Sequence, residues 1–207
     1  MANTLYITGE LTYAKASGFM PAFDNAATAT GIDRNLLLAI ASRESSMGLS
    51  LDSRGLGDNG HGNGLMQVDD RYHGGFTSTY SPFDHRQNVL KGAQILQAEI
   101  NRYGGNLNYA LPAYNTGSGN VNKALGRGLS PDAYTTGDDY GRDVLDRYSI
   151  IKSMGGTEQK VVNNSLVTVP GKPEDEAQQL VIFSGAALLS ALLGTSYIAT
   201  KKIKSNE

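Results

Sequence analysis

Apolar residues recur at helical spacing in two segments near the start of the chain. The first segment predicts a helix over residues 18–30, which Gly31 ends. The second predicts a helix that Asp33 caps and Gly48 ends, with Glu44 in its last turn. The apolar positions of the two helices are Phe19, Ala22, Phe23, Ala26 and Ala27, and then Leu37, Ile40 and Ala41.

Further along, the pattern predicts a long helix that opens at Pro82 and Asp84 and closes at Gly104-Gly105. Its buried stripe consists of Val89, Ala93, Leu96 and Ile100. Another helical face follows at Leu107, Ala110, Leu111 and Tyr114. Pro112 falls inside this face, which predicts a kink or a late start of the helix.

A break at residues 115–119 separates these helices from a short helix at 121–125. A last helix is predicted over residues 138–154, and Gly155-Gly156 end it. One side of this helix carries Tyr140, Val144, Tyr148 and Ile151.

Glycine interrupts the helical pattern between residues 55 and 64, where polar residues lie between the glycines. This composition predicts a loop or a short irregular hairpin, followed by a short strand at residues 65–69. The fold class that we expect is therefore mainly α, with a small irregular β region, in one domain over residues 1–156.

The end of the chain has a different character. Residues 157–178 are polar and contain two prolines and an acidic run, which indicates a linker. Residues 180–199 contain no charge, and a helix of that length spans about 30 Å, the thickness of a bilayer core. We expect a transmembrane-type helix over 179–200 and a basic tail over 201–207, with the lipid bilayer as partner of residues 180–199. The alternative is a helix that packs on the domain or on another protein.

Composition narrows the function. The chain has 207 residues, of which 40% are hydrophobic and 18% charged, as in globular proteins. A formal net charge of −2 gives no reason to expect nucleic acid as a partner. Cysteine is absent, which excludes disulfides and thiolate chemistry. Residues 1–10 lack a basic region followed by an apolar run, so we expect no cleaved secretory signal.

Glu44 is the most informative residue. It shares the apolar face of its helix with Leu37, Ile40 and Ala41, at spacings of three, four and seven residues. Burial of a carboxyl raises its pKa and favours the protonated form near neutral pH, as a general acid for glycosidic cleavage requires. The alternative is a glutamate at a helix end that turns to solvent or caps a loop.

Two familiar patterns do not apply to this chain. Gly55, Gly57 and Gly60 fit the spacing of a dinucleotide-binding loop, but no apolar strand precedes them and no helix opens after them. His61, His73 and His85 are spaced by twelve residues each, which is not the spacing of a metal-binding pair on a helix, and we expect them to be exposed loop histidines. We therefore expect neither a metal nor a cofactor.

Three further segments follow Ser42-Arg43-Glu44-Ser45 at informative spacings. They are Gly55-Leu56-Gly57-Asp58-Asn59-Gly60, Gly62-Asn63-Gly64-Leu65-Met66-Gln67-Val68-Asp69-Asp70-Arg71-Tyr72-His73, and Ala113-Tyr114-Asn115-Thr116-Gly117-Ser118-Gly119-Asn120-Val121. In order and spacing, these segments resemble the goose-type lysozyme family, which is related to the soluble lytic transglycosylases. The resemblance covers about residues 15–155 and leaves out the linker and the apolar segment.

The resemblance implies a lysozyme-like fold with a deep cleft, and cleavage of the β-1,4 bond between N-acetylmuramic acid and N-acetylglucosamine in peptidoglycan. It assigns Glu44 as the general acid and Asp58 and Asp69 as the carboxylates that hold or activate water. It also places Gln67, Tyr114, Asn115 and Tyr140 at the substrate.

The residue environments agree with this division of roles, since Asp58 and Asp69 lie in a polar stretch where a carboxylate stays ionised. Each assignment has a structural alternative: an Asx-turn for Asp58, a cap of the segment after the strand for Asp69 or Asp70, solvent for Gln67, and the core for Tyr140. Tyr114 has the same alternative as Tyr140, and Asn115 has that of a turn residue. Without a usable base, the 6-hydroxyl of the substrate attacks instead and gives the anhydro product of a lytic transglycosylase. Both aspartates are present, which favours hydrolysis.

The apolar segment and the missing signal lead to an expectation about location. We expect a membrane-associated protein of a bacteriophage particle that opens the cell wall in the bacterial envelope when the phage delivers its genome, with other virion proteins as further partners. One alternative is a lysis protein released late in infection. Another is a virion component that grips glycan strands without cleaving them.

Overall fold

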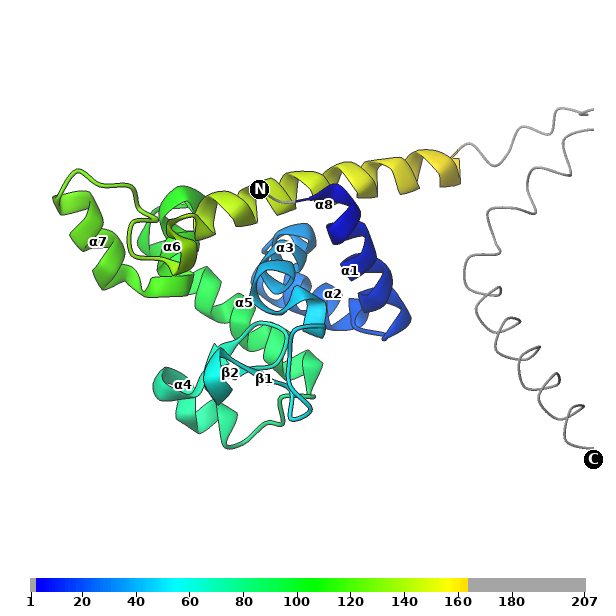
Figure 1. Cartoon of the computed structure of the whole chain (residues 1–207). Helices are drawn as coiled ribbons and strands as arrows, with labels where there is room; N and C mark the ends of the chain where they lie inside the picture. Colours follow the sequence, from blue (N-terminus) through cyan, green and yellow to red (C-terminus); the bar gives the residue numbers. More distant parts are fainter. Residues whose placement is uncertain (1–2, 164–207) are drawn as a thin grey trace, which may run out of the picture. The chain divides into compact units, whose positions relative to one another are not determined.

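The computed structural model describes residues 3–163. Within them the fold is mainly helical, with one small sheet (Figure 1), which confirms the expected fold class. The α-helices are α1 (Thr4–Ala16), α2 (Met20–Thr30), α3 (Arg34–Ser45), α4 (Asp70–Thr77), α5 (His85–Arg102), α6 (Leu107–Thr116), α7 (Ser118–Gly126) and α8 (Tyr140–Asn163). Short 3-10 helices occur at η1 (Ser46–Gly48), η2 (Asp58–Gly60) and η3 (Thr136–Asp138).

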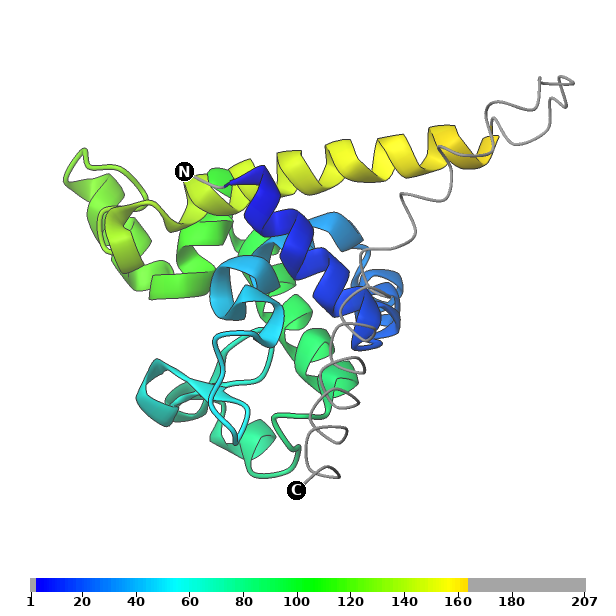
Figure 2. The same cartoon turned by 45° about the vertical axis from the view of Figure 1, so that its right-hand side comes forward.

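Helix α3 lies at the centre of the helical part, with α1, α2, α5 and α8 around it (Figures 1 and 2). Its residues 36–42 are all buried, because neighbouring helices cover every side of it. Asp33 caps the helix as predicted, and its carboxylate accepts a hydrogen bond from the backbone N–H of Asn35. The helix that carries Glu44 is therefore fixed on all sides.

The apolar patterns of three other predicted helices are confirmed. In α2, Ala22, Phe23 and Ala26 are buried, and Gly31 ends the helix in the left-handed conformation. In α5 and α8, the predicted stripes face the core, with Ile100 and Tyr148 partly buried at the margin. These long amphipathic helices could be predicted because the local spacing of apolar residues determines which face is buried.

Several predicted helix ends were wrong. Helix α3 ends at Ser45 rather than at Gly48, because Ser46 and Met47 already take left-handed conformations, with φ of 48° and 56°. Helix α6 starts at Leu107 and runs through Pro112, so of the two effects predicted for this proline, a kink or a late start, the late start was wrong. Only Gly117 separates α6 from α7, where a longer break at 115–119 was expected.

Helix α8 continues through Gly155-Gly156 to Asn163, although the two glycines predict its end. Glycine costs a helix about 1 kcal/mol relative to alanine, which does not suffice to stop it. In residues 3–163, no helix is long and apolar enough to cross a membrane. The predicted transmembrane-type helix at 179–200, most of the linker and the basic tail lie outside the described residues.

Two helices were not predicted. Helix α1 turns Ile7, Glu10 and Ala14 inward, while Leu5 and Tyr6 are exposed. A buried carboxylate and exposed apolar residues hide the amphipathic pattern on which prediction depends. Helix α4 was missed because two glycines interrupt it and none of its residues is buried.

The glycine-rich region forms a three-stranded antiparallel sheet in the order β1-β2-β3, which lies with α4 on one side of α5 (Figures 1 and 2). Its strands are β1 (Leu56–Gly57), β2 (Gly62–Asn63) and β3 (Val68–Asp69). The last strand is shorter than the predicted 65–69, because Gln67 is left-handed with φ of 48°. Buried Asn88 of α5 anchors the region, accepting from Met66 N and donating to the Asn63 carbonyl at 2.9 and 2.8 Å.

Candidate active site

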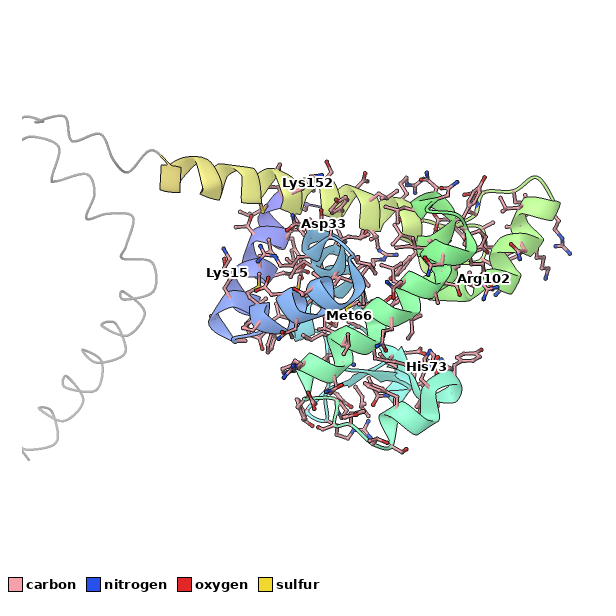
Figure 3. The ribbon with its side chains drawn as sticks, turned by 180° about the vertical axis from the view of Figure 1, so that it is seen from behind. Lys15, Asp33, Met66, His73, Arg102 and Lys152 are labelled. Carbon is pink, nitrogen blue, oxygen red and sulfur yellow. The ribbon has the colours of Figure 1, made fainter. Side chains whose placement is uncertain are left out.

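A cavity of about 1180 Å³ lies between the end of α3, the sheet region and helices α4, α5 and α6. Figure 3 shows the molecule from behind, with Met66 near its middle and His73 on α4. The seven residues that the sequence predicts for the site all line this cavity. They are Glu44, Asp58, Gln67, Asp69, Tyr114, Asn115 and Tyr140.

Glu44 lies in the last turn of α3, partly buried at the wall of the cavity. Burial raises its pKa from the ordinary value of 4.5 to about 7, against the opposing effects of a hydrogen bond from Tyr140 and the charge of Arg43. The hydroxyl of Tyr140 donates to Glu44 Oε1 at 2.5 Å. In residues 3–163, no other hydrogen-bond partner contacts this carboxyl, so Oε2 is free to carry the acidic proton.

Tyr140 opens helix α8 and is only 1% exposed. Its ring therefore belongs to the core, the alternative that the sequence left open, and its hydroxyl is bonded to Glu44. The first turn of α8 is fixed by Asp132, whose carboxylate accepts from Gly141 N at 2.7 Å. Gly141 also packs closely on α6, since a methyl group there would lie 2.7 Å from the ring of Pro112. Tyr140 is thus held where it meets Glu44.

Asp58 and Asp69 come together across the sheet region through Arg71. Arg71 Nη2 donates to Asp58 Oδ2 at 2.7 Å and to Asp69 Oδ2 at 2.6 Å. Hydrogen bonds from Arg71 lower the pKa of Asp69, so this carboxylate stays ionised as expected. Asp69 is also the N-cap of α4, which was the structural alternative.

Gln67 and Tyr114 are both held by backbone carbonyls. Gln67 Nε2 donates to the Gly64 carbonyl at 2.8 Å, and its amide fills the space above the paired glycines 57 and 62, where any larger side chain would overlap it. The hydroxyl of Tyr114 donates to the Met66 carbonyl at 2.8 Å. Both side chains form fixed walls of the cavity.

Asn115, next to Tyr114 at the end of α6, links two parts of the wall. Its Oδ1 accepts a hydrogen bond from Thr136 N at 3.0 Å, which ties α6 to η3. The side chain lies at the cavity as predicted, and it also serves the turn-like structural role that was its alternative.

Among the other residues that line this cavity, two have a functional position that the sequence did not predict. Arg71 links the two aspartates, and Tyr72 lines the cavity with 81% of its surface exposed. Both follow Asp69 directly, within the segment that resembles the family. An arginine two residues after an aspartate is a signal for a local ion pair, and an exposed aromatic beside a site indicates a contact surface for a ligand.

A network of charged residues lies behind Glu44 and ties three helices together. Arg147 of α8 donates to Asp143 Oδ2 at 2.7 Å and to Ser42 Oγ at 2.6 Å, and Ser42 in turn donates to the buried Glu10 of α1. Arg43 joins the network through Asp143 at 3.3 Å and contacts Asp139 at 3.0 Å. The two residues before Glu44 are therefore anchored by α1 and α8.

Comparison with known proteins gives one consistent family. The sequence model of a family described as "Lysozyme g" matches residues 10–155. Lysozyme G of Dromaius novaehollandiae is 35% identical over 133 residues, which cover 60% of this chain and 61% of that protein. Lysozyme g of Epinephelus coioides is 36% identical over 140 residues, which cover 61% of this chain and 70% of that protein. The chain thus spans about three fifths of the length of the first of these relatives.

Proposed function

Because the chain belongs to the lysozyme g family, we propose that it is a glycosidase that acts on bacterial peptidoglycan. The bond that it cleaves is the β-1,4 linkage between N-acetylmuramic acid and N-acetylglucosamine. The observation that carries the proposal is the Glu44 carboxyl, which lines the cavity with a pKa raised to about 7. A carboxylic acid that keeps its proton near neutral pH can protonate the oxygen of a leaving sugar.

The hydrogen bond from Tyr140 determines which oxygen of Glu44 carries the proton. Since Glu44 Oε1 accepts from the Tyr140 hydroxyl, the acidic proton resides on Oε2. As the glycosidic bond breaks, Glu44 becomes a carboxylate, and the same hydrogen bond together with the charge of Arg43 stabilises it. Tyr140 is thus a positioning residue, and Glu44 is the catalytic acid.

The carboxylates of Asp58 and Asp69 can supply the second catalytic group, a general base. An inverting glycosidase needs a base that takes a proton from water as the water attacks the anomeric carbon. Asp58 and Asp69 line the same cavity as Glu44, and Arg71 neutralises part of their mutual repulsion. The presence of these two carboxylates supports hydrolysis over attack by the substrate's own 6-hydroxyl.

The remaining cavity residues fit the binding of a glycan strand. Gln67 and Asn115 offer amide groups for hydroxyl and acetamido groups of the sugars, and Tyr114 forms part of the wall of the same cavity. Tyr72 adds an exposed ring at the cavity on which a sugar can stack. The proposal requires neither a metal nor a cofactor.

Digestion of purified cell walls, with mass spectrometry of the released muropeptides, tests this proposal. The wild type should release fragments with reducing ends, and Glu44→Gln should release none while it still binds the walls. Fragments with 1,6-anhydro ends would instead identify a lytic transglycosylase. Wild-type protein that binds walls and releases nothing would identify a glycan-binding protein without activity.

A matched control shows whether the loss of activity is specific to Glu44 or follows from removing any carboxylate that lines the cavity. Glu99 also lines the cavity, from α5, and pairs with Arg102 at 3.1 Å. Glu99→Gln should retain the release of reducing ends, because this carboxylate has no part in the proton transfer. Equal loss in both variants would contradict the special role of Glu44.

The proposal extends to location. The uncharged residues 180–199, followed by Lys201, Lys202 and Lys204, support association with a bilayer. We place the protein in a phage particle that opens the wall during genome delivery, with release late in infection as the alternative. Full-length protein should float with lipid vesicles, and Leu189→Arg should abolish flotation. Equal flotation of the two would refute the membrane association.

A further inference from the structure

The two aspartates share one guanidinium, but their hydrogen bonds are unequal. Asp69 Oδ1 accepts from the backbone N–H of Arg71 at 2.8 Å and from its Nε at 2.9 Å. Asp69 Oδ2 accepts from Nε at 3.1 Å and from Nη2 at 2.6 Å. The Nε–H group is shared between the two oxygens, so three N–H groups of Arg71 donate to Asp69 and engage both of its oxygens.

Asp58 is bound through one oxygen only. Its Oδ2 accepts from Arg71 Nη2 at 2.7 Å, and in residues 3–163 no donor lies within hydrogen-bonding distance of Oδ1. The side chain of Asp58 is 54% exposed, against 25% for Asp69. Water in the cavity can therefore reach an oxygen of Asp58 that accepts no hydrogen bond, whereas both oxygens of Asp69 already accept from Arg71.

The backbone explains why Asp58 needs an anchor. Asp58 and Asn59 both have left-handed conformations, with φ of 44° and 56°. Residues other than glycine adopt this region at a cost and persist there when the surroundings hold them. The ion pair with Arg71 links this turn to the start of α4, where Asp69 caps the helix.

We propose that Arg71 gives the two aspartates different roles. Asp58 alone accepts the proton of the attacking water, and Asp69 anchors Arg71. This inference rests on the proposed glycosidase function. Arg71 and Asp69 are then positioning residues, and Asp58 is the catalytic base. The lowered pKa of Asp69 agrees with this division, because a carboxylate that binds a cation through both oxygens is a poor base.

The chemical step balances with these groups. The water oxygen bonds to the anomeric carbon as the glycosidic bond breaks, and the proton of Glu44 passes to the leaving oxygen. The proton of the water passes to Asp58 Oδ1. The products are a reducing sugar end and a new hydroxyl group, and solvent returns the proton from Asp58 to Glu44.

Muropeptide mass spectrometry of Asp58→Asn, Asp69→Asn and Arg71→Lys tests the division. In Asp58→Asn the formation of reducing ends should fall at least about 100-fold, because a general base typically contributes that much. Without the base, the ratio of anhydro to reducing ends should rise. Asp69→Asn should lower reducing ends only about tenfold, because Asp58 keeps its oxygen for water but loses its fixed position.

The variants at Asp69 and Arg71 should behave as one unit. Arg71→Lys should resemble Asp69→Asn, and the double variant should be no worse than either single one, since residues of one unit are not additive. A loss in Asp69→Asn as large as in Asp58→Asn, or hydrolysis that survives in Asp58→Asn, would overturn the inference.

The chain offers a matched control in Asp52 and Arg54. Arg54 chelates Asp52 at the same spacing of two residues, with Nη2 to Oδ2 at 2.8 Å, outside the residues that line the cavity. Arg54→Lys should leave both the amount and the ratio of products unchanged, and a loss equal to that of Arg71→Lys would contradict a specific role. Wild type that releases no fragments would refute the proposed function itself, and this inference with it. If the wild type is active but Asp58→Asn does not lose more activity than Asp69→Asn and Arg71→Lys, the inference is refuted and the proposed function stands.

Discussion

Replacing Glu44 with glutamine should make the stability of the protein less dependent on pH. In the wild type, the pKa of Glu44 rises from 4.5 in an exposed chain to about 7 in the fold, chiefly by burial. The folded state therefore binds this proton more tightly than the unfolded state does. The resulting stabilisation is fully present below pH 4.5, and it is lost as pH rises through about 7.

The size of the effect follows from the two pKa values. Each pH unit between them corresponds to about 1.4 kcal/mol, so ionisation of Glu44 should cost the fold about 3 kcal/mol. Glutamine has no proton to lose and keeps an oxygen that can accept from the Tyr140 hydroxyl. The free energy of unfolding of Glu44→Gln should therefore exceed that of the wild type by about 3 kcal/mol more at about pH 8 than at about pH 4.

Urea denaturation of both proteins across this pH range measures the difference directly. Asp24→Asn serves as the control, because its carboxylate is 56% exposed and forms only a surface ion pair with Arg34. The control should follow the wild type closely throughout. If the curves for wild type and Glu44→Gln run parallel from acid to alkaline pH, the carboxyl ionises freely and the reasoning from burial is refuted.

Three further variants test the surroundings of the acid. Tyr140→Phe removes a hydrogen bond that lowers the pKa of Glu44, so the alkaline limb of the pH–activity profile should move above about 7, and a downward move would contradict this role. Tyr72→Ala should raise KM about tenfold with little change in kcat, whereas Tyr72→Phe should keep the wild-type KM, because only the ring stacks on the sugar. Gly141→Ala should lower the free energy of unfolding by about 1–3 kcal/mol in urea denaturation, because its methyl group overlaps Pro112; unchanged stability would refute the close packing.

The sequence alone predicted those features of the structure that depend on residues close together in the chain. The face that carries Glu44 is formed by residues within two turns of one helix, so periodicity predicts it, and the surrounding fold supplies the burial that raises its pKa. The stripes of α5 and α8 were predicted for the same reason. The resemblance to the family predicted that residues from distant segments surround one cavity, which periodicity alone does not predict.

Contacts between distant segments were not predictable in the same way. Tyr140 meets Glu44 across 96 residues of sequence, and the meeting depends on how Gly141 packs against Pro112. The link from Arg71 to Asp58 depends on the left-handed turn at Asp58 and Asn59, which the spacing of apolar residues does not predict. Helix α1 was missed because its buried face includes Glu10, whose partners come from α3 and α8.

The account depends most on a proton held by Glu44 at neutral pH. Carbon-13 NMR titration of the side-chain carboxyl, with the signal assigned by its absence in Glu44→Gln, measures this property in the folded protein. We expect a midpoint near the pKa of about 7. A midpoint near the ordinary value of 4.5 would mean that Glu44 is ionised at neutral pH and would contradict its role as the acid.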